Sequence, residues 1–490
     1  MRKTIPIIAV VIIAALMRLY NLSLPPLFFD ESIHATILKS LFNGNYKYDP
    51  AYHGPLLYYL LYVPVQTLGE SEFSLRILPA LTGIVVSLTP FLYRRFIGDD
   101  AAVIAAILVA ISAIIVNYSR FCRADIFQLL FTALFAYFIF RYLEKEKSLT
   151  DLRVDKDTLF LAAAFVFMAL FATLKETFYP IAAIFALYFI FDIKKFRVSD
   201  LAISLAVFLL VYFAFYTNLF TYTTPLTNFS EFPAVKAVSY WKYQHEIARI
   251  AGPWYYYLEL ILLYDLPAFL LAIFAVYTII TQRKEFEAFA AYWFLSSLIF
   301  FSYMQEKVPW LNVHILFPMY LLAGIGISRL ASRIDRQKLK CVVVICILFS
   351  AYGSVHVNHI NPVNPAEPAL YLPTQYDVRE FAEKTKNETV YVFTSIGEYW
   401  PLAWYLKDHK AYFISASVEG RMFEEGDYII VNTTNDMRLD KTNLEFVETM
   451  VVRCWTFWTQ PDISRVPEFL VFRGPLTDVS CMNFSVYRTK

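Results

Sequence analysis

The sequence predicts a polytopic α-helical membrane protein of about 11 transmembrane helices, followed by a small C-terminal extracytoplasmic α/β domain. Three observations predict this class. Of 490 residues, 58% are hydrophobic and 17% are charged, whereas an average soluble domain has about 25% charged residues. The apolar residues lie in blocks close to the length of about 20 residues that spans a bilayer. These blocks end near residue 355, and a mixed pattern follows.

The apolar blocks should be helices, because backbone amides in lipid must hydrogen-bond within one segment. The expected spans are 4–22, 76–93, 101–118, 125–142, 158–173, 177–192, 200–217, 256–280, 287–303, 311–328 and 340–355. The first block could also be a cleaved signal peptide, since Arg2 and Lys3 precede an apolar stretch of suitable length. A retained anchor is favoured, because further spans follow and no clear cleavage site is present.

Lysine and arginine in the connecting loops predict the orientation of the chain. With a cytoplasmic N-terminus, about 19 of them lie in inner loops and about 11 in outer loops. An odd number of spans then places the C-terminal region outside. The sequence therefore predicts a multi-pass cell-membrane protein with a membrane domain over 1–355 and an extracytoplasmic domain over 356–490.

The C-terminal region has the pattern of a soluble α/β domain. A proline-rich linker over 358–373 precedes it. Strands are expected at 390–394, 411–414 and 428–432, with a helix at 400–406 between two of them. The region also holds three glycosylation sequons, weakly indicative of an external surface, which begin at Asn387, Asn432 and Asn483. Cys454 and Cys481 could pair there, although their spacing does not require it.

Charge and motif content exclude other classes. The net charge of +1, from 43 basic and 42 acidic residues, argues against a nucleic-acid partner. The five cysteines show no metal-ligand spacing. No Gly-rich phosphate loop of the dinucleotide-binding or Walker type is present.

Two adjacent carboxylates, Asp30 and Glu31, follow the first span on the predicted outer side. Carboxylates at a lipid–water boundary are costly to desolvate, which favours a functional role. They would equally begin a helix over 31–41, with Asp30 as the cap and Glu31 favourable to the helix dipole. The two roles are compatible.

Other polar side chains are expected at the same face. Arg120 and Arg123 would share one side of a helix, although snorkelling to the interface is the commoner role of such arginines. Five further residues lie at the start of a helix or in short outer turns. The alternative to a functional role there is an ordinary polar turn, with the tryptophan in the aromatic belt of the membrane. They are Asp125, Lys175, Glu306, Lys307 and Trp310.

This mixture suits transfer of a sugar from a lipid-linked phosphate. Lysine and arginine can bind the phosphate and stabilise its charge as it leaves. A carboxylate can take the proton of an incoming hydroxyl. Such a reaction needs no nucleotide, in keeping with an outer face that lacks nucleotide sugars.

At this point the chain resembles the GT-C superfamily of polyprenyl-phosphate-sugar-dependent glycosyltransferases, near the protein-mannosyltransferase branch. The resemblance covers residues 1–180 well and the later spans loosely. It rests on Arg18, Pro25, Asp30, Glu31, His34, 48–50, 53–59, 76–83, 118–120, Asp125 and Lys175. Residues 306–310 with His314 and Pro318 resemble an archaeal subgroup named as flippase-associated proteins of the N-glycosylation pathway. The family often has His-x-Pro-Pro-Leu where this chain has His53-Gly54-Pro55-Leu56.

The resemblance implies roles for these residues. Asp30 would be the catalytic carboxylate, with Glu31 beside it and Asp125 lining the same cavity. The donor phosphate would be bound by Lys175, Lys307, Arg120 and Arg123. The acceptor or the cavity wall would involve His34, His53, Glu306 and Trp310. Related oligosaccharyltransferases bind a divalent cation and protein mannosyltransferases show no clear metal requirement, so the cofactor stays open.

The predicted function is transfer of a single sugar, with inversion, from a polyprenyl (dolichyl) phosphate to a protein, glycan or lipid acceptor at the outer membrane face, in cell-surface or N-glycan assembly. A flippase or flippase-associated protein for lipid-linked sugars is the alternative, and an inactive scaffold a third. Transporters often show internal repeats and Gly/Pro-broken helices. The chain shows no repeat and only 13 glycines, which favours the enzyme.

Overall fold

The computed structural model describes residues 4–145, 147, 154–247, 250–281, 284–395, 397–415, 423–432, 441–456 and 461–490. Arg2 and Lys3 lie outside these residues. The chain divides into two compact units. The first comprises Met1–Tyr20 and Asn43–His359, and the second comprises Asn21–Phe42 and Ile360–Lys490. The segment after the first span therefore packs with the C-terminal residues, although the sequence assigned it to the membrane domain.

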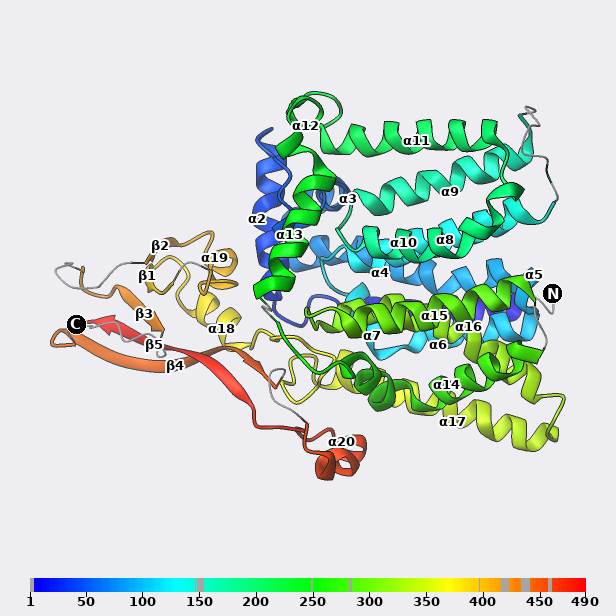
Figure 1. The fold of residues 1–490 in the computed structure, drawn as a ribbon. Coiled ribbons are helices and arrows are strands. Elements are labelled where there is room, and N and C mark those ends of the chain that lie inside the picture. Colours follow the sequence, from blue (N-terminus) through cyan, green and yellow to red (C-terminus); the bar gives the residue numbers. More distant parts are fainter. Residues whose placement is uncertain are drawn as a thin grey trace. The chain divides into compact units, whose positions relative to one another are not determined.

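The first unit is a bundle of helices, most of which run side by side (Figure 1). They are α1 (Thr4–Leu19), α3 (Pro55–Leu68), α4 (Glu72–Leu88), α5 (Arg94–Ile97), α6 (Asp99–Ile111), α7 (Ala113–Ser119), α8 (Asp125–Leu143), α9 (Lys156–Ala172), α10 (Phe178–Phe189), α11 (Val198–Tyr216), α12 (Thr224–Thr227), α13 (Pro233–Ile247), α14 (Tyr256–Thr281), α15 (Glu285–Tyr303), α16 (Val313–Leu330) and α17 (Arg336–Val355).

Every apolar block expected to span the membrane overlaps at least one of these helices, and the block 101–118 is divided between α6 and α7. Within the described ranges, 7 helices are long and apolar enough to cross a bilayer, or up to 8 if the bent pair α6–α7 is one span. The other blocks form α1 with 16 residues, α9 with 17 and α10 with 12. These helices fall at or below the lower limit of about 17 residues for a span. The polytopic helical class is confirmed, and the count of 11 stays a prediction.

Helix α16 lies at the centre of the bundle, with 94% of its span buried. Two glycines allow its backbone to approach its neighbours. A Cβ at Gly324 would lie 2.2 Å from the carbonyl oxygen of Ala101 on α6, and one at Gly326 would lie 2.3 Å from that of Leu271 on α14. Small residues at such contacts are the usual device for close helix packing in membranes.

A bend of 59° separates α6 from α7. Ser112 forms it, because its hydroxyl oxygen accepts a hydrogen bond from the amide of Ile115 at 3.3 Å and starts a new helix. Tyr320 of α16 donates to the same oxygen at 2.8 Å. The bend directs α7 toward the turn 120–124, which leads into α8.

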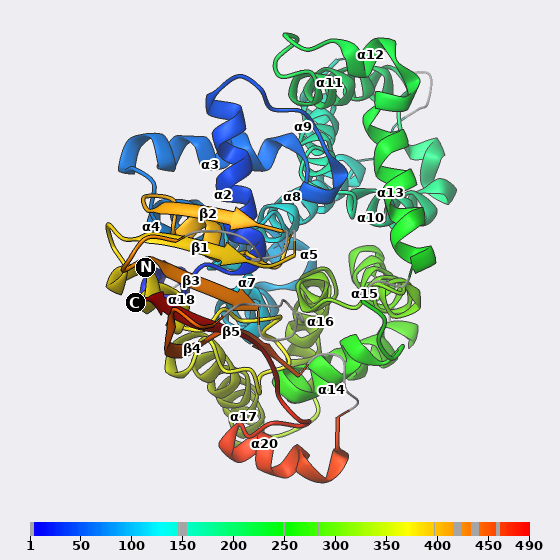
Figure 2. The ribbon, with the colours of Figure 1, turned by 90° about the vertical axis from the view of Figure 1, so that its left-hand side faces the viewer.

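The second unit contains α2 (Phe29–Phe42) and a five-stranded sheet in the order β2-β1-β3-β5-β4, seen in Figure 2. Its other elements are α18 (Asp377–Lys384), β1 (Thr389–Phe393), α19 (Leu402–Tyr405), β2 (Lys410–Ile414), β3 (Tyr428–Asn432), β4 (Leu444–Trp455), α20 (Val466–Phe472) and β5 (Ser480–Thr489). Strands β1, β2 and β3 are parallel, and β5 runs antiparallel to β3 and β4.

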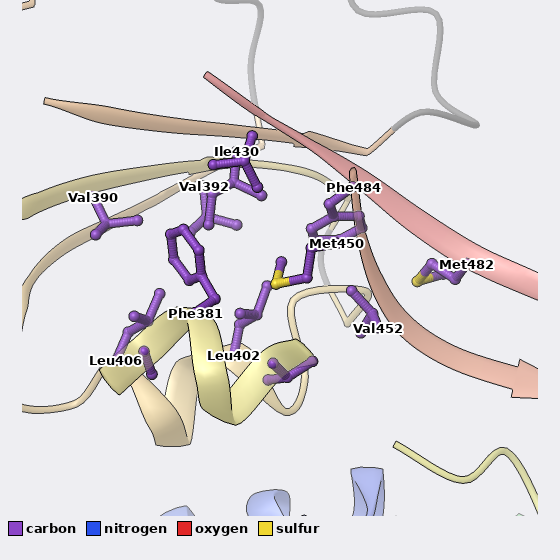
Figure 3. Close-up of a cluster of buried hydrophobic side chains, with 13 residues drawn as sticks. Phe381, Val390, Val392, Leu402, Leu406, Ile430, Met450, Val452, Met482 and Phe484 are labelled. Atoms are coloured by element: carbon purple, nitrogen blue, oxygen red, sulfur yellow. The ribbon is translucent and has the colours of Figure 1, made fainter. Parts of the chain in front are cut away.

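One face of this sheet carries the larger hydrophobic core, drawn in Figure 3. Val392 of β1, Ile430 of β3 and Phe484 of β5 are fully buried there. Phe381 of α18 and Leu402 of α19 cover them. The expected α/β domain is thus confirmed, and its three predicted strands and its helix coincide with β1, β2, β3 and α19 within two residues at each end.

The two cysteines and the three sequon asparagines of the second unit lie on its strands or in its turns. Cys454 of β4 and Cys481 of β5 are opposite each other and form a disulfide. Asn387 is exposed in the turn before β1. Asn432 is fully buried and donates a hydrogen bond to Glu398 at 2.9 Å. The side chain of Asn432 therefore does not lie on the surface, contrary to the expectation for an acceptor site.

Candidate functional site

A cluster of ionised side chains lies where several helices of the first unit begin or end. Asp125 is the first residue of α8 and is fully buried. The Nε of Arg123 donates to Asp125 Oδ2 at 3.0 Å, and the Nζ of Lys175 lies 3.5 Å from Asp125 Oδ1. The fold thus joins the turn before α8 to the turn between α9 and α10.

Trp310 completes this cluster, which we call the Asp125 cluster: Arg123, Asp125, Lys175 and Trp310. The guanidinium of Arg123 lies 3.8 Å from the centroid of the indole ring, and Lys175 Nζ lies 5.5 Å from it. A desolvated cation over a tryptophan face is stabilised by about 2 kcal/mol. Arg123 is therefore held by a carboxylate and an aromatic face, so its position is fixed.

Lys175 is the more available cation of the cluster. Its side chain is 12% exposed, against 1% for Arg123. Burial lowers the pKa of Lys175, and the carboxylate of Asp125 opposes that shift. A partly desolvated ammonium with one distant carboxylate is well suited to bind an oxyanion such as a phosphate.

Glu176 follows Lys175 and is buried, although the sequence indicated only a polar turn. The hydroxyl of Tyr48 donates to its Oε1 at 3.3 Å. Burial raises the pKa of Glu176 to about 7, and Lys175 and the Tyr48 hydrogen bond limit this rise. A carboxyl group that titrates near neutral pH therefore lies beside the candidate phosphate-binding lysine.

The His53-Gly54 sequence packs against the same turn. The amide of Gly54 donates to the carbonyl oxygen of Leu174 at 2.7 Å. A Cβ at Gly54 would lie 2.2 Å from the carbonyl oxygen of Thr173, so only glycine fits here. His53 is buried and close enough for its charge to act on Asp125. Backbone contact thus explains the glycine at the variable position of the family pattern.

Two of the predicted phosphate ligands are engaged by the main chain. Arg120 Nη1 donates to the carbonyl oxygens of Arg18 at 3.0 Å and Tyr20 at 2.9 Å, at the end of α1. Lys307 Nζ donates to the carbonyl oxygens of Phe301 at 3.0 Å and Ser302 at 2.6 Å, at the end of α15. Cations at helix C-termini are stabilised by the free carbonyls. Both residues thus have a structural role that the sequence did not indicate.

Glu306 is half-buried next to Lys307, and its charge acts on both Lys175 and Glu176. It therefore lies near the turn between α9 and α10, and its place in the site stays a prediction.

The remaining predicted residues lie on α2, in the second unit. Glu31 is fully buried, and its Oε2 accepts a hydrogen bond from the amide of Phe28 at 2.9 Å. Glu31 thus makes a capping contact at this end of the helix, and Asp30 is the second residue of α2, not the residue before it that the sequence predicted as the cap. Asp30 is partly exposed and His34 is buried.

Sequence reasoning missed Glu176, Tyr48 and the buried His314 as candidates. A carboxylate directly after Lys175 was visible in the sequence, but its burial depends on Tyr48, 128 positions away. His314 was noted only for its resemblance. Among the described residues, no group of three or more His, Cys, Asp or Glu side chains is arranged to hold a metal ion.

Comparisons with known proteins find a matching family model, one relative and similar folds. A family model described as dolichyl-phosphate-mannose-protein mannosyltransferase matches residues 52–220, the stretch that contains His53, the Asp125–Arg123 pair and Lys175. An uncharacterized protein of Aquifex aeolicus is 24% identical over 291 residues, which are 57% of this chain and 55% of that protein. The match thus spans about half the length of that relative.

Two solved structures share the fold. ArnT from Cupriavidus metallidurans bound to undecaprenyl phosphate has a TM-score of 0.65 and 13% identity, over 88% of this chain and 93% of ArnT. The archaeal oligosaccharyltransferase AglB from Archaeoglobus fulgidus, in complex with an inhibitory peptide and a dolichol-phosphate, has a TM-score of 0.55 and 13% identity, over 84% of this chain and 64% of AglB.

These findings confirm the predicted resemblance to the GT-C superfamily of polyprenyl-phosphate-sugar-dependent glycosyltransferases. The chain is a multi-pass membrane protein with the GT-C fold.

Proposed function

We propose that the chain transfers a single sugar from a polyprenyl phosphate to a protein, glycan or lipid acceptor at the outer membrane face, with inversion at the anomeric carbon. The Asp125 cluster carries this proposal. It places a buried carboxylate, a fixed arginine and a more available lysine together at the helix ends, in a fold shared with proteins solved with undecaprenyl phosphate and dolichol-phosphate.

Lys175 binds the donor phosphate in this proposal. Its ammonium is close to Asp125 but not saturated by it, at 3.5 Å. As the bond between the anomeric carbon and the phosphate oxygen breaks, negative charge grows on the phosphate. A fixed cation in a desolvated site stabilises that charge. Asp125 fixes the positions of both cations, Arg123 by a hydrogen bond and Lys175 by an ion pair.

Asp30 is the proposed base. The acceptor hydroxyl attacks the anomeric carbon while Asp30 takes its proton, and the polyprenyl phosphate leaves with the electron pair of the broken bond. A single displacement of this kind inverts the anomeric configuration. Two points support Asp30: it lies inside the first turn of α2, not at the cap position, and its side chain is partly exposed.

The outer-face location is supported by the disulfide between Cys454 and Cys481. Disulfides persist in oxidising compartments and are rare in the cytosol. Together with the charge asymmetry of the loops, this favours an extracytoplasmic second unit. A membrane-impermeant thiol reagent should therefore label an engineered cysteine at the exposed Asn387 in intact cells. Labelling only after the membrane is breached would contradict the topology.

The test of the function is Asp30→Asn in purified protein supplied with polyprenyl-phosphate sugars. Asparagine has nearly the size and shape of aspartate, and Asp30 is partly exposed, so the melting temperature should hardly change. Loss of a general base should lower transfer at least about 100-fold.

Glu31→Gln is the matched control, because it weakens the capping contact without removing the proposed base. It should lower the melting temperature and leave more activity than Asp30→Asn. Near-normal turnover by Asp30→Asn would exclude Asp30 as the base. Absence of transfer by the wild type with every donor offered would exclude the function.

A further inference from the structure

A histidine close to the Asp125 cluster has no evident structural reason to be a histidine. His314 is the second residue of α16 and is fully buried. Neither of its ring nitrogens has a hydrogen-bond partner among the residues that the structure describes. Buried polar atoms nearly always have one, and an unmade bond costs stability. The contacts that the structure describes therefore do not explain why this residue is a histidine, and a ligand is a candidate partner for its nitrogens.

The packing around the ring suits an apolar side chain. Phe171 of α9 stacks on one side, with ring centroids 6.1 Å apart and planes at 24°. Phe301 of α15 also stacks on it, at 5.8 Å and 17°. A phenylalanine would fill such a space without two unpaired nitrogens. Aromatic packing alone thus does not account for His314.

The electrostatic surroundings connect His314 to the site. The charges of Asp125 and Lys175 both act on its ring. Phe171 is the penultimate residue of α9, which leads into the turn with Lys175. Asp125 Oδ1 is also buried, and apart from its ion pair with Lys175 it has no hydrogen bond within the described ranges of the chain. The ring nitrogens of His314 on α16 and the Oδ1 of Asp125 on α8, for which the described residues offer no hydrogen bond, thus both lie near Lys175.

We propose that His314 is a positioning residue that hydrogen-bonds a hydroxyl group of the sugar carried by the donor. The inference rests on the proposed function and names what its site recognises beyond the phosphate. In a polyprenyl-phosphate sugar, the sugar is attached directly to the phosphate. If Lys175 binds that phosphate, the hydroxyl groups of the sugar therefore lie close to the neighbours of Lys175, which include Asp125 and the ring of His314.

A neutral imidazole can donate from one nitrogen and accept at the other, so it matches a hydroxyl in both roles. A site that hydrogen-bonds a substrate hydroxyl discriminates strongly against a ligand that lacks it, because its buried polar atoms then stay unpaired. His314 is thus expected to distinguish a donor that carries a sugar from the bare lipid phosphate.

The experiment compares binding of dolichyl phosphate and dolichyl phosphate mannose to the wild type and to His314→Phe in detergent. We expect His314→Phe to melt at the same or a higher temperature, because it removes two unpaired nitrogens. Its affinity for dolichyl phosphate should stay unchanged, and its affinity for the mannosyl lipid should fall about 10-fold or more. His314→Gln keeps a donor and an acceptor and should recover part of the loss.

Trp293→Phe is the control. It also removes a buried nitrogen without a described partner, but on the part of α15 that packs on Phe185 and Phe317. It should leave both affinities unchanged. Equal affinities of wild type and His314→Phe for the mannosyl lipid would overturn the proposal, as would an equal loss for both lipids. A wild type that binds neither lipid would instead overturn the proposed function.

Discussion

Two buried aspartates of the first unit each pair with a nearby arginine, but their surroundings differ. Asp200 of α11 accepts hydrogen bonds from Arg197 Nε at 2.6 Å, Tyr142 at 2.9 Å and Thr158 at 2.7 Å. Arg197 also binds Asp155 through both of its terminal nitrogens. In this cluster, which we call the Asp200 cluster, each carboxylate oxygen of Asp200 has a hydrogen-bond donor.

The Asp125 cluster is incomplete by the same measure. Asp125 Oδ2 has a donor in Arg123, whereas the described residues offer Oδ1 no hydrogen bond, and Lys175 lies 3.5 Å from it. A fully satisfied buried network rigidifies a fold, and a partly satisfied one is costly unless something else completes it. The comparison teaches that buried charge alone does not identify a site, and that unsatisfied buried charge is the better indicator.

The largest expected difference follows from replacing the two aspartates. Asp200→Asn removes a charge from a closed network and should cost about 3–5 kcal/mol of stability. Asp125→Asn should lower turnover per folded molecule about 10²- to 10³-fold, because it disturbs the field at the phosphate. Thermal melting and transfer assays on monodisperse protein separate the two effects. Equal turnover losses per folded molecule would remove the distinction between the clusters.

Glu176, which follows Lys175 of the Asp125 cluster, should make the stability of the protein depend on pH. Burial raises its pKa from 4.5 to about 7, so the folded protein holds a proton that the unfolded chain releases. Stability should therefore fall as pH rises from about 4.5 to 7, by about 3 kcal/mol in total, and level off above that. The melting temperature of Glu176→Gln should lack this decline. Parallel curves for wild type and variant would exclude Glu176 as the cause.

Lys175 and Lys307 provide a smaller test, because one is available and the other is bound to main-chain carbonyls. Lys175→Met should weaken donor binding by about 1.5–3 kcal/mol, or roughly 10- to 150-fold. Lys307→Met should lower the melting temperature and leave donor affinity nearly unchanged, although the sequence predicted a phosphate contact. Titration with undecaprenyl phosphate measures both. Similar losses of affinity in both variants would restore Lys307 as a ligand.

The smallest effect is expected at an exposed ion pair. Lys195 and Glu285 lie 2.9 Å apart with side chains 46% and 50% exposed. Such pairs contribute about 0–1 kcal/mol. Lys195→Ala should therefore change neither the melting temperature nor donor binding beyond that range. A large loss of stability would show that exposure is a poor guide to the value of charge pairs in this bundle.

The helices were predictable because lipid forces long apolar segments to form them. Strands β1, β2 and β3 were predictable because they are short apolar runs. Strands β4 and β5 were missed. In β4, charged residues such as Glu445, Glu448 and Arg453 and two register shifts interrupt the apolar pattern, whereas β5 alternates in burial and could have been found. Their pairing, with Cys454 opposite Cys481, depends on tertiary contacts.

Part of the site was predictable from residue types alone. Asp125, Arg123 and Lys175 were singled out from their places at helix ends, and the structure brings them together. The carbonyl contacts of Arg120 and Lys307 were not predictable, because their acceptors are main-chain atoms whose availability depends on where α1 and α15 end.

The contact at Gly54 has a consequence for motion. Residues 53–56 are joined to the turn before Lys175 by two main-chain hydrogen bonds, Gly54 to Leu174 and Leu56 to Thr173, with no room for a side chain between them. The two segments therefore move as one mechanical element. A ligand that displaces the His53 loop displaces Lys175 as well. Binding at either segment should therefore change the affinity of the other segment for its ligand by the same factor.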